Sequence, residues 1–266
     1  MRILIVKTSA LGDIVHALPV LSCLKALHEH VIIDWIVESR FSELLSGHPA
    51  VSRLLVVDTK KWRRHPLSSE VSFEVVNFVR QLRGQFYDVV FDLQGNFKSG
   101  LITLFARADT KVGLAPRYMQ ERINRLFVNT VSGYCNSKHI SDVYINTIQS
   151  FYNSSCPPDL IPDIYTSPDD DAAAVALLGE NTLADLVCIH HGTTWETKLW
   201  YDDGWVVVAQ QILKTYPHST IVLSSGSLEE LEHSNKLAEK IGDRVIVLPL
   251  LPLKQFIALL KRMTLS

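Results

Sequence analysis

Apolar runs of strand length recur along the first half of the chain, and each is followed by a helical pattern of apolar positions. Strands are predicted at about 2–6, 31–37, 53–58, 87–92 and 111–114. Helices are predicted at about 13–28, 39–46, 69–84, 96–106 and 139–152. Strands that alternate with helices are typical of a parallel sheet with right-handed crossovers.

The segment 153–171, "NSSCPPDLIPDIYTSPDDD", separates this half from a second alternating region. It carries four prolines and no periodicity, which is typical of an interdomain linker. Strand patterns follow in "LVCIH", "TIVLSS" and "RVIVLPL", with helical patterns at about 203–215, 228–241 and in "LKQFIALLKRM". The predicted fold class is therefore α/β, with two Rossmann-like domains, residues 1–155 and 156–266, that face a cleft. Because the second region shows only three strand patterns, we expect that domain to be incomplete.

Charge balance, cysteine spacing and the lengths of the apolar runs argue against a nucleic-acid-binding, metal-binding, secreted or membrane-spanning protein. Lys and Arg total 26 against 28 Asp and Glu, so no global field favours nucleic acid as a partner. The cysteines show no CxxC and no metal-ligand spacing, so we expect free thiols in a reducing cytosol. They are Cys23, Cys135, Cys156 and Cys188. Charged residues interrupt the apolar N-terminal run, which argues against a signal peptide, and no stretch approaches about 18 uninterrupted apolar residues.

The first strand-to-helix junction, "VKTSALGDIVHALP", is rich in polar groups. Asp13 stands where the strand has ended and a helix opens, behind Lys7, Thr8 and Ser9. One interpretation is a carboxylate favoured by the helix dipole. The other is a general base at the carboxyl edge of the sheet, which takes a proton from a substrate hydroxyl. The number of polar groups in the turn favours the second interpretation.

The second region has a corresponding junction, "HHGTTWETKLW", residues 190–200. Thr193 and Thr194 offer hydroxyls and Lys198 an ammonium, a set suited to a diphosphate. The alternative is a solvated loop whose threonines cap a turn. His190 and His191 are adjacent, so on a strand they would point to opposite faces and would form a poor metal pair.

Two further segments carry candidate binding groups. In "FDLQGNFKSG", residues 91–100, polar side chains follow a strand and either face the cleft or cap a helix; they are Asp92, Gln94, Asn96 and Lys98. In "KKWRRH", residues 60–65, four cations surround Trp62 in a predicted loop; they are Lys60, Lys61, Arg63 and Arg64. This run is either a solvated face or a clamp for a phosphorylated or carboxylated substrate. The acids of "SPDDD" are interpreted as a helix cap after Pro168.

Taken together, these junctions resemble the ADP-heptose:lipopolysaccharide heptosyltransferases, glycosyltransferase family 9, and most closely the heptosyltransferase I type. The resemblance rests on "ILIVKTSALGDIVHALP", "YDVVFDLQGNFKSGLIT" and "HGTTWETKLW", which occur in the family's order. It implies a GT-B fold and an inverting transfer of heptose from ADP-heptose to Kdo of Kdo-lipid A, in lipopolysaccharide inner-core synthesis. It implies no metal ion and no cofactor. It also implies a cytoplasmic enzyme, peripheral on the inner membrane.

The resemblance assigns roles to particular residues. Asp13 maps onto the family's general base, and Lys198, with Thr193 and Thr194, onto the groups around the sugar diphosphate. An acidic residue soon after the next strand contacts the nucleoside, and here it is Glu229 or Glu230. The acceptor's acidic groups are expected to meet polar side chains of the first domain: Lys7, Thr8, Ser9, Lys60, Lys61, Arg63, Arg64, Gln94, Asn96 and Lys98.

Three alternatives bear on the function. The family's pattern continues with a strand, a "DTG" loop and a helix, whereas this sequence ends at "KRMTLS", so a truncated, inactive nucleotide-sugar-binding remnant is one alternative. A glycosyltransferase of the same fold that uses another sugar nucleotide is the second. A Rossmann oxidoreductase, the third, is disfavoured because "KTSALGD" lacks the GxGxxG fingerprint.

Overall fold

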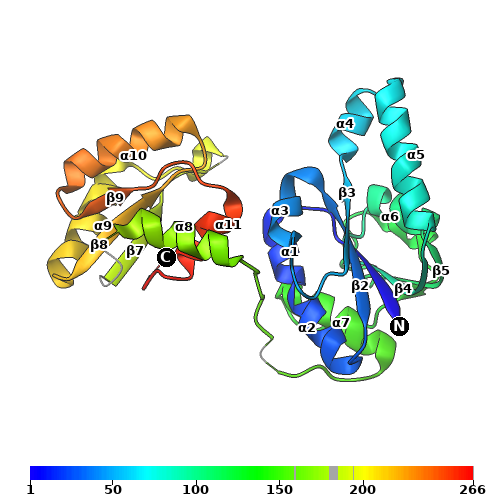
Figure 1. The fold of residues 1–266 in the computed structure, drawn as a ribbon. Coiled ribbons are helices and arrows are strands. Elements are labelled where there is room, and N and C mark those ends of the chain that lie inside the picture. The colour runs from blue at the N-terminus through cyan, green and yellow to red at the C-terminus, as the bar shows by residue number, and fades with distance from the viewer. Residues whose placement is uncertain (159, 180–184, 194, 266) are drawn as a thin grey trace. The chain divides into compact units, whose positions relative to one another are not determined.

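The computed structural model describes residues 1–158, 160–179, 185–193 and 195–265. The chain divides into two compact units, Met1–Tyr165 and Thr166–Ser266. Each unit contains one parallel sheet with helices connecting its strands, as the alternating pattern predicts (Figure 1). No helix among the described residues is long and apolar enough to cross a membrane.

The first unit is built on a six-stranded sheet of order β3-β2-β1-β4-β5-β6, with every neighbouring pair parallel. Its strands are β1 (Arg2–Val6), β2 (Ile32–Glu38), β3 (Arg53–Val57), β4 (Phe86–Asp92), β5 (Arg107–Gly113) and β6 (Thr130–Val131). The five predicted strands are all present, and only the two-residue β6 is additional. Residues 3–6 of the central β1 are all buried, as expected for a parallel strand covered on both faces.

The helices of the first unit differ from the prediction in three places, one of which is the additional short helix η2 (Arg122–Phe127). They are α1 (Leu11–Ala17), α2 (Pro19–Leu27), η1 (Ser39–Phe41), α3 (Ser42–Leu45), α4 (Thr59–Arg64), α5 (Ser69–Arg83), α6 (Phe97–Phe105), η2 (Arg122–Phe127) and α7 (Ile140–Tyr152). The helix predicted at 13–28 is two helices, because Pro19 has no N–H to continue α1 and instead begins α2. The basic segment predicted as a loop is the helix α4, which Asp58 caps by accepting from the Lys61 backbone N–H at 2.9 Å.

The second unit has a three-stranded parallel sheet of order β7-β8-β9. Its elements are α8 (Pro168–Leu178), β7 (Asp185–His190), η4 (Glu196–Lys198), α9 (Asp202–Thr215), β8 (Ser219–Ser224), α10 (Leu228–Ile241), β9 (Val245–Val247) and α11 (Leu253–Leu260). Ile221 and Leu223 pack with α9 and α10, whereas Val222 packs with α8 and α11. The sheet is therefore covered on both faces. At the free edge of β7, the Cys188 N–H donates to the Leu265 carbonyl at 2.8 Å.

The start of α8 confirms the capping role expected for "SPDDD". The Ser167 hydroxyl accepts from the backbone N–H of Asp170 at 3.2 Å, and the Asp170 carboxylate accepts in return from the Ser167 N–H at 2.9 Å. These two bonds satisfy donors at the helix start, as in a capping box. The acids of this segment therefore need no metal ion to explain them.

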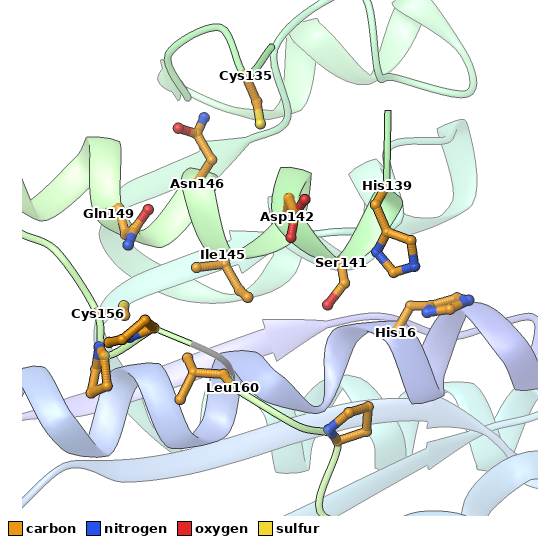
Figure 2. Close-up of a pocket in the computed structure, with 13 residues that line it drawn as sticks. His16, Cys135, His139, Ser141, Asp142, Ile145, Asn146, Gln149, Cys156 and Leu160 are labelled. Carbon is orange, nitrogen blue, oxygen red and sulfur yellow. The ribbon is translucent and has the colours of Figure 1, made fainter. Parts of the chain in front are cut away.

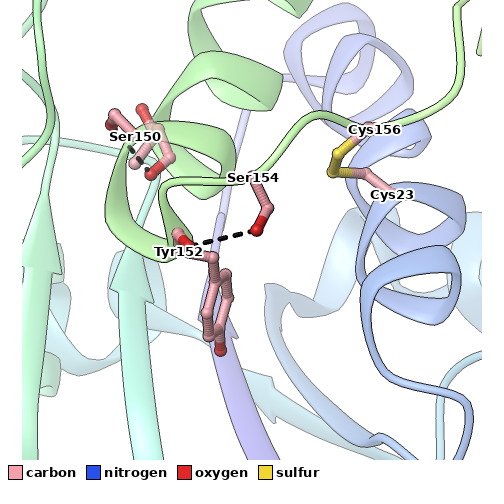
Figure 3. Close-up of a disulfide and its surroundings, with 6 residues drawn as sticks. Cys23, Ser150, Tyr152, Ser154 and Cys156 are labelled. Atoms are coloured by element: carbon pink, nitrogen blue, oxygen red, sulfur yellow. Dashed lines mark hydrogen bonds between the residues drawn. A yellow bond between two sulfur atoms is a disulfide. The ribbon is translucent and has the colours of Figure 1, made fainter.

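A disulfide corrects the expectation that all four cysteines are free. Cys23 of α2 is bonded to Cys156, in the segment after α7, with the two Cα atoms 5.2 Å apart (Figure 3). Cys135 and Cys188 are free. The pairing could not be derived from the sequence, because the two residues are 133 positions apart and belong to no recognisable spacing.

The connection after α7 belongs to the first unit, so the division of the chain falls later than residue 155. Besides the disulfide at Cys156, the His48 imidazole Nε2 hydrogen-bonds to the Asp163 carbonyl oxygen at 3.0 Å. These contacts hold the proline-rich segment against the first sheet's helices up to Tyr165.

Candidate functional site

Asp13 lies in the first turn of α1, at the carboxyl end of the central strand β1. Its Oδ2 atom accepts a hydrogen bond from the Ala10 backbone N–H at 3.3 Å, and the positive end of the helix dipole favours its charge. The side chain is nevertheless 39% exposed. The two interpretations offered for Asp13 are therefore compatible, because a carboxylate that stabilises the helix start still reaches solvent, where a substrate hydroxyl can approach it.

Lys7 lies beneath Asp13 and is fully buried. Its Nζ atom is 3.7 Å from Asp13 Oδ2, longer than a hydrogen bond, and 5.2 Å from the centre of the Tyr144 ring. Burial lowers the pKa of Lys7, and the charge of Asp13 opposes that shift. An ammonium placed so deeply supports Asp13 and has no surface to offer an acceptor, which differs from the contact role expected for it.

The loop between β1 and α1 is held by Gln94. The Gln94 Oε1 atom accepts from the backbone N–H groups of Thr8 and Ser9, at 3.0 Å each. Gln94 and Thr8 are both buried, so they also serve the loop and not an acceptor surface. Asn96 caps α6 through its Oδ1 atom, which accepts from the Ser99 N–H at 3.0 Å.

Asp92 is fully buried at the start of α6, so the structure supports the capping interpretation of this segment and not the one in which Asp92 faces a cleft. It accepts from the Gly95 N–H at 2.9 Å, the Ser99 hydroxyl at 2.9 Å and the Asn124 side-chain amide at 2.7 Å. Burial raises the pKa of Asp92, and these hydrogen bonds oppose the shift. Asp92 therefore organises the start of α6. Asn124, which no sequence pattern identifies, supplies another of its hydrogen-bond donors.

A pocket of about 520 Å³, here called the cationic pocket, opens at the carboxyl ends of the first unit's strands. It is lined by Ser9, Glu38, Ser39, Arg40, Asp58, Thr59, Lys60, Arg63 and Lys98. Its two carboxylates are engaged by the chain itself: Glu38 accepts from the Thr59 N–H at 3.2 Å, and Asp58 caps α4. Four cationic side chains share the same pocket, which suits an anionic ligand.

Part of the predicted acceptor-binding set lines this pocket, and part of it lies outside the pocket. Lys61 does not line the pocket. Its ammonium forms ion pairs with Glu70 at 2.8 Å and Glu74 at 2.5 Å, which raise the pKa of Lys61. Arg64 is exposed and does not line the pocket. Arg40 was not predicted, although a cation directly after the strand at 31–37 is a signal that could have identified it.

A second pocket of the first unit, about 480 Å³, lies between α1, α7 and the proline-rich segment (Figure 2). His16 of α1 and His139 at the start of α7 meet edge to face there, with ring centroids 5.0 Å apart. His16 follows Asp13 by three residues on α1, and residues three apart are neighbours on a helix face. Figure 2 shows Asp142 and Ser141 near these rings.

In the second unit, the loops that follow β7 and β8 lie against each other. Thr193 is half-buried and Lys198 is exposed at the end of η4, while Thr194 lies outside the described residues. Glu230 Oε2 accepts from the Gly226 N–H at 2.6 Å, and the same carboxylate occupies the space that a Cβ atom on Gly192 would need. Glu229 is exposed on α10. Of the two acids left open by the sequence, Glu230 therefore lies beside the Thr193 loop.

The two adjacent histidines fix this loop. His190 is exposed, and its Nδ1 lies 3.1 Å from the Ser224 hydroxyl, whereas His191 is buried, with Nε2 2.8 Å from the Ser234 hydroxyl. Burial and the neighbouring His233 lower the pKa of His191. The two histidines thus point to different partners, as expected. No group of three metal-ligating side chains occurs in the part of the chain that the structure describes.

We expect the neutral His191 to make stability depend on pH. Because its pKa is lowered by folding from an unfolded value of about 6.5, the unfolded chain binds more protons below that pH, and the free energy of unfolding falls as the solution is acidified. His191→Asn should make the pH dependence of denaturant unfolding shallower between about pH 6.5 and 5. The control His218→Asn, at an exposed position, should leave it unchanged. Equal slopes for wild type and His191→Asn would contradict the assignment.

Comparison with known proteins places the chain in a family. The family model "Glycosyltransferase family 9 (heptosyltransferase)" matches residues 75–266. Lipopolysaccharide heptosyltransferase 1 of Pseudomonas aeruginosa is 30% identical over 253 residues, which cover 95% of this chain and 68% of the relative. The enzyme of that name from Escherichia coli K12 is 29% identical over 257 residues, 96% of this chain and 77% of the relative.

The fold agrees with these relatives. The structure of E. coli heptosyltransferase WaaC with ADP-2-deoxy-2-fluoro heptose matches with a TM-score of 0.83 and 27% identity, over 99% of this chain and 81% of that one. A family 9 glycosyltransferase from Veillonella parvula matches with a TM-score of 0.82 and 20% identity, over 98% and 74%. These matches confirm the predicted GT-B fold. The chain therefore belongs to glycosyltransferase family 9, the heptosyltransferase family.

Proposed function

We propose that the chain transfers L-glycero-D-manno-heptose from ADP-heptose to Kdo of Kdo-lipid A, in the synthesis of the lipopolysaccharide inner core, with inversion and without a metal ion. One observation carries the proposal: an accessible carboxylate, Asp13, stands beside a pocket with four cations. Ser9 lines that pocket, and Ala10, the next residue, donates to Asp13. The base and the anion-binding groups are therefore parts of one structural feature.

In the proposed reaction, the first unit holds the acceptor. The guanidinium groups of Arg40 and Arg63 can each bind a carboxylate or a phosphate with two parallel hydrogen bonds, and Lys60 and Lys98 add point charges. Kdo carries a carboxylate and lipid A carries phosphates, so the charge of the acceptor is opposite in sign to that of these cationic side chains. Asp13 then removes the proton from the acceptor hydroxyl as that oxygen attacks the anomeric carbon.

The second unit supplies the donor's binding groups in this proposal. Thr193, Thr194 and Lys198 hold the diphosphate, and Lys198 stabilises the negative charge that builds up as ADP departs. Glu230 accepts from the nucleoside, because its carboxylate lies beside the Thr193 loop, whereas Glu229 extends from α10 into solvent. The names of the matched relatives, and the ADP-heptose analogue in the matched E. coli structure, support this choice of donor.

We place the reaction at the cytoplasmic surface of the inner membrane, with the enzyme bound there peripherally, because the proposed acceptor is a lipid and its donor is a water-soluble nucleotide sugar. The cationic side chains of the pocket favour an anionic membrane surface as well as an anionic acceptor.

Mass spectrometry of the acceptor tests the function. Kdo-lipid A incubated with the chain and ADP-heptose should gain one heptosyl residue, and ADP-glucose or UDP-glucose should give no product. Transfer from another sugar nucleotide in preference to ADP-heptose would favour the same-fold alternative. Binding of ADP with no transfer from any donor would favour the inactive remnant.

Lys7→Met tests whether the buried ammonium supports Asp13. Methionine keeps most of the volume and removes the charge, so kcat should fall severalfold while both KM values stay near those of the wild type, because the Asp13 carboxylate loses the cation that lies 3.7 Å from its Oδ2 atom and helps to hold it in place. Thermal stability should not fall, since a buried charge is costly to keep. A kcat equal to that of the wild type would show that Lys7 has only a structural role.

A further inference from the structure

An apolar groove lies between α4, α5 and α6 of the first unit, which are neighbours in Figure 1. It has a volume of about 220 Å³ and is lined by Thr59, Trp62, Val75, Phe78, Val79, Lys98, Leu101, Ile102 and Phe105. Seven of these nine side chains are aliphatic or aromatic. An apolar hollow of this kind is typical of a site for a hydrocarbon group.

Two residues of α4, Trp62 and Lys61, hold the walls of the groove in place through contacts with α5. The Trp62 ring packs at 5.6 Å from the Phe78 ring, and its indole N–H donates to Glu74 at 3.2 Å. Lys61 joins α4 to α5 through its ion pairs with Glu70 and Glu74. Because the one polar atom of Trp62 is already bonded, the remainder of the indole ring serves as an apolar wall.

The groove is continuous with the cationic pocket. Thr59 and Lys98 line both hollows, so an apolar channel adjoins a site that holds Arg40, Lys60 and Arg63. A ligand that fills both must carry anionic groups at one end and a hydrocarbon chain at the other. The outer face of α5 exposes further apolar side chains, with Phe73 72% and Val76 55% exposed. Exposed apolar surface beside cations is a pattern found where proteins meet lipids.

We propose that this groove binds one acyl chain of the lipid acceptor whose acidic groups occupy the cationic pocket. The proposal rests on the function given above, and it deepens that function by making part of the lipid, and not its sugar alone, a determinant of acceptor binding. Each methylene group buried in such a groove should strengthen binding by about fourfold. An acylated acceptor should therefore bind at least tenfold more tightly than its deacylated counterpart.

A kinetic comparison tests the groove with two acceptors and two variants. Leu101→Glu places a carboxylate in the groove, and Leu104→Glu places one on the same helix at a position outside it. The quantity measured is the ratio of the KM for Kdo-lipid A to the KM for the fully deacylated acceptor. This ratio should be at least tenfold higher in Leu101→Glu than in the wild type. In Leu104→Glu it should equal the wild-type ratio. An unchanged ratio in Leu101→Glu, or equal KM values for both acceptors in the wild type, would overturn the proposal.

A binding measurement separates failure of the groove from failure of the enzyme. Kdo-lipid A with brominated acyl chains should quench tryptophan fluorescence saturably without any donor, and Trp62→Phe should lose that quenching, because Trp62 is the tryptophan that lines the groove. Quenching without heptosyl transfer would support the groove and contradict the proposed function. Transfer without quenching would show that the groove does not bind the acceptor's acyl chain. Equal quenching by a brominated phosphatidylglycerol would show that the groove does not select that chain. Neither result would contradict the proposed function.

Discussion

Replacing Asp13 by Asn should lower kcat for heptosyl transfer by about 10²- to 10⁴-fold, the range in which a positioned general base contributes. Asparagine keeps the size of the side chain but cannot accept the acceptor's proton. The KM values for donor and acceptor should change little, because the binding groups of both substrates lie elsewhere. Initial rates followed by release of ADP measure the effect. Turnover within tenfold of the wild type would rule out Asp13 as the base.

The loss of activity must be separated from a loss of structure. Asp13→Asn keeps an oxygen that can accept from the Ala10 N–H, but it removes the negative charge favoured at the helix start, worth at most about 1 kcal/mol, and it takes the negative partner from the buried Lys7. The double variant Lys7→Met, Asp13→Asn leaves no buried ammonium without its partner. It should unfold at or above the wild-type denaturant concentration and should be as inactive as Asp13→Asn. An inactive but well-folded double variant therefore assigns the loss to catalysis.

Neutralising the cationic pocket should weaken acceptor binding strongly. Lys60→Gln, Arg63→Gln and Lys98→Gln together should raise the acceptor KM by about a hundredfold, at about 1 kcal/mol for each exposed ion pair lost. The acceptor KM should also depend less on salt, because fewer charges are screened. The donor KM should stay near its wild-type value, and steady-state kinetics at two ionic strengths measure all three quantities.

Arg64→Gln is the matched control for the triple variant. Arg64 is an exposed cation of the same helix, α4, but it does not line the pocket. Its replacement should change the acceptor KM by less than about twofold. An effect of Arg64→Gln as large as that of the triple variant would show that the net charge of the helix, and not the pocket, determines acceptor binding. A change confined to the donor KM would assign these cations to the other substrate.

The strands and the main helices were predictable because buried parallel strands are nearly continuous apolar runs and their connecting helices have a clear period. The split at Pro19 and the short helix α4 were not predicted. A six-residue helix is too short to be stable alone, and α4 depends on the Asp58 cap and on the pairing of Lys61 with α5. Contacts of this kind become visible only once the chain has folded.

In the candidate site, too, some features follow from the sequence pattern and others depend on contacts that form only when the chain folds. The lining of the cationic pocket by Lys60, Arg63 and Lys98 was predictable, and so was the position of Asp13, because polar groups that follow parallel strands gather at the carboxyl edge of the sheet. The sequence does not say which polar side chains of a junction turn inward. Lys7 and Gln94 were expected to contact the acceptor, but both are buried, where Lys7 lies beside Asp13 and Gln94 holds the loop between β1 and α1.

The anomeric configuration of the product tests the central claim most directly. If Asp13 activates the acceptor hydroxyl for a single displacement at the donor's anomeric carbon, the new glycosidic bond has the configuration opposite to that of ADP-heptose. Nuclear magnetic resonance of the glycolipid formed from ADP-heptose and Kdo-lipid A measures that configuration. An inverted heptosyl linkage to Kdo is the predicted result. A product that retains the donor's configuration, or an acceptor recovered without heptose, would contradict the account.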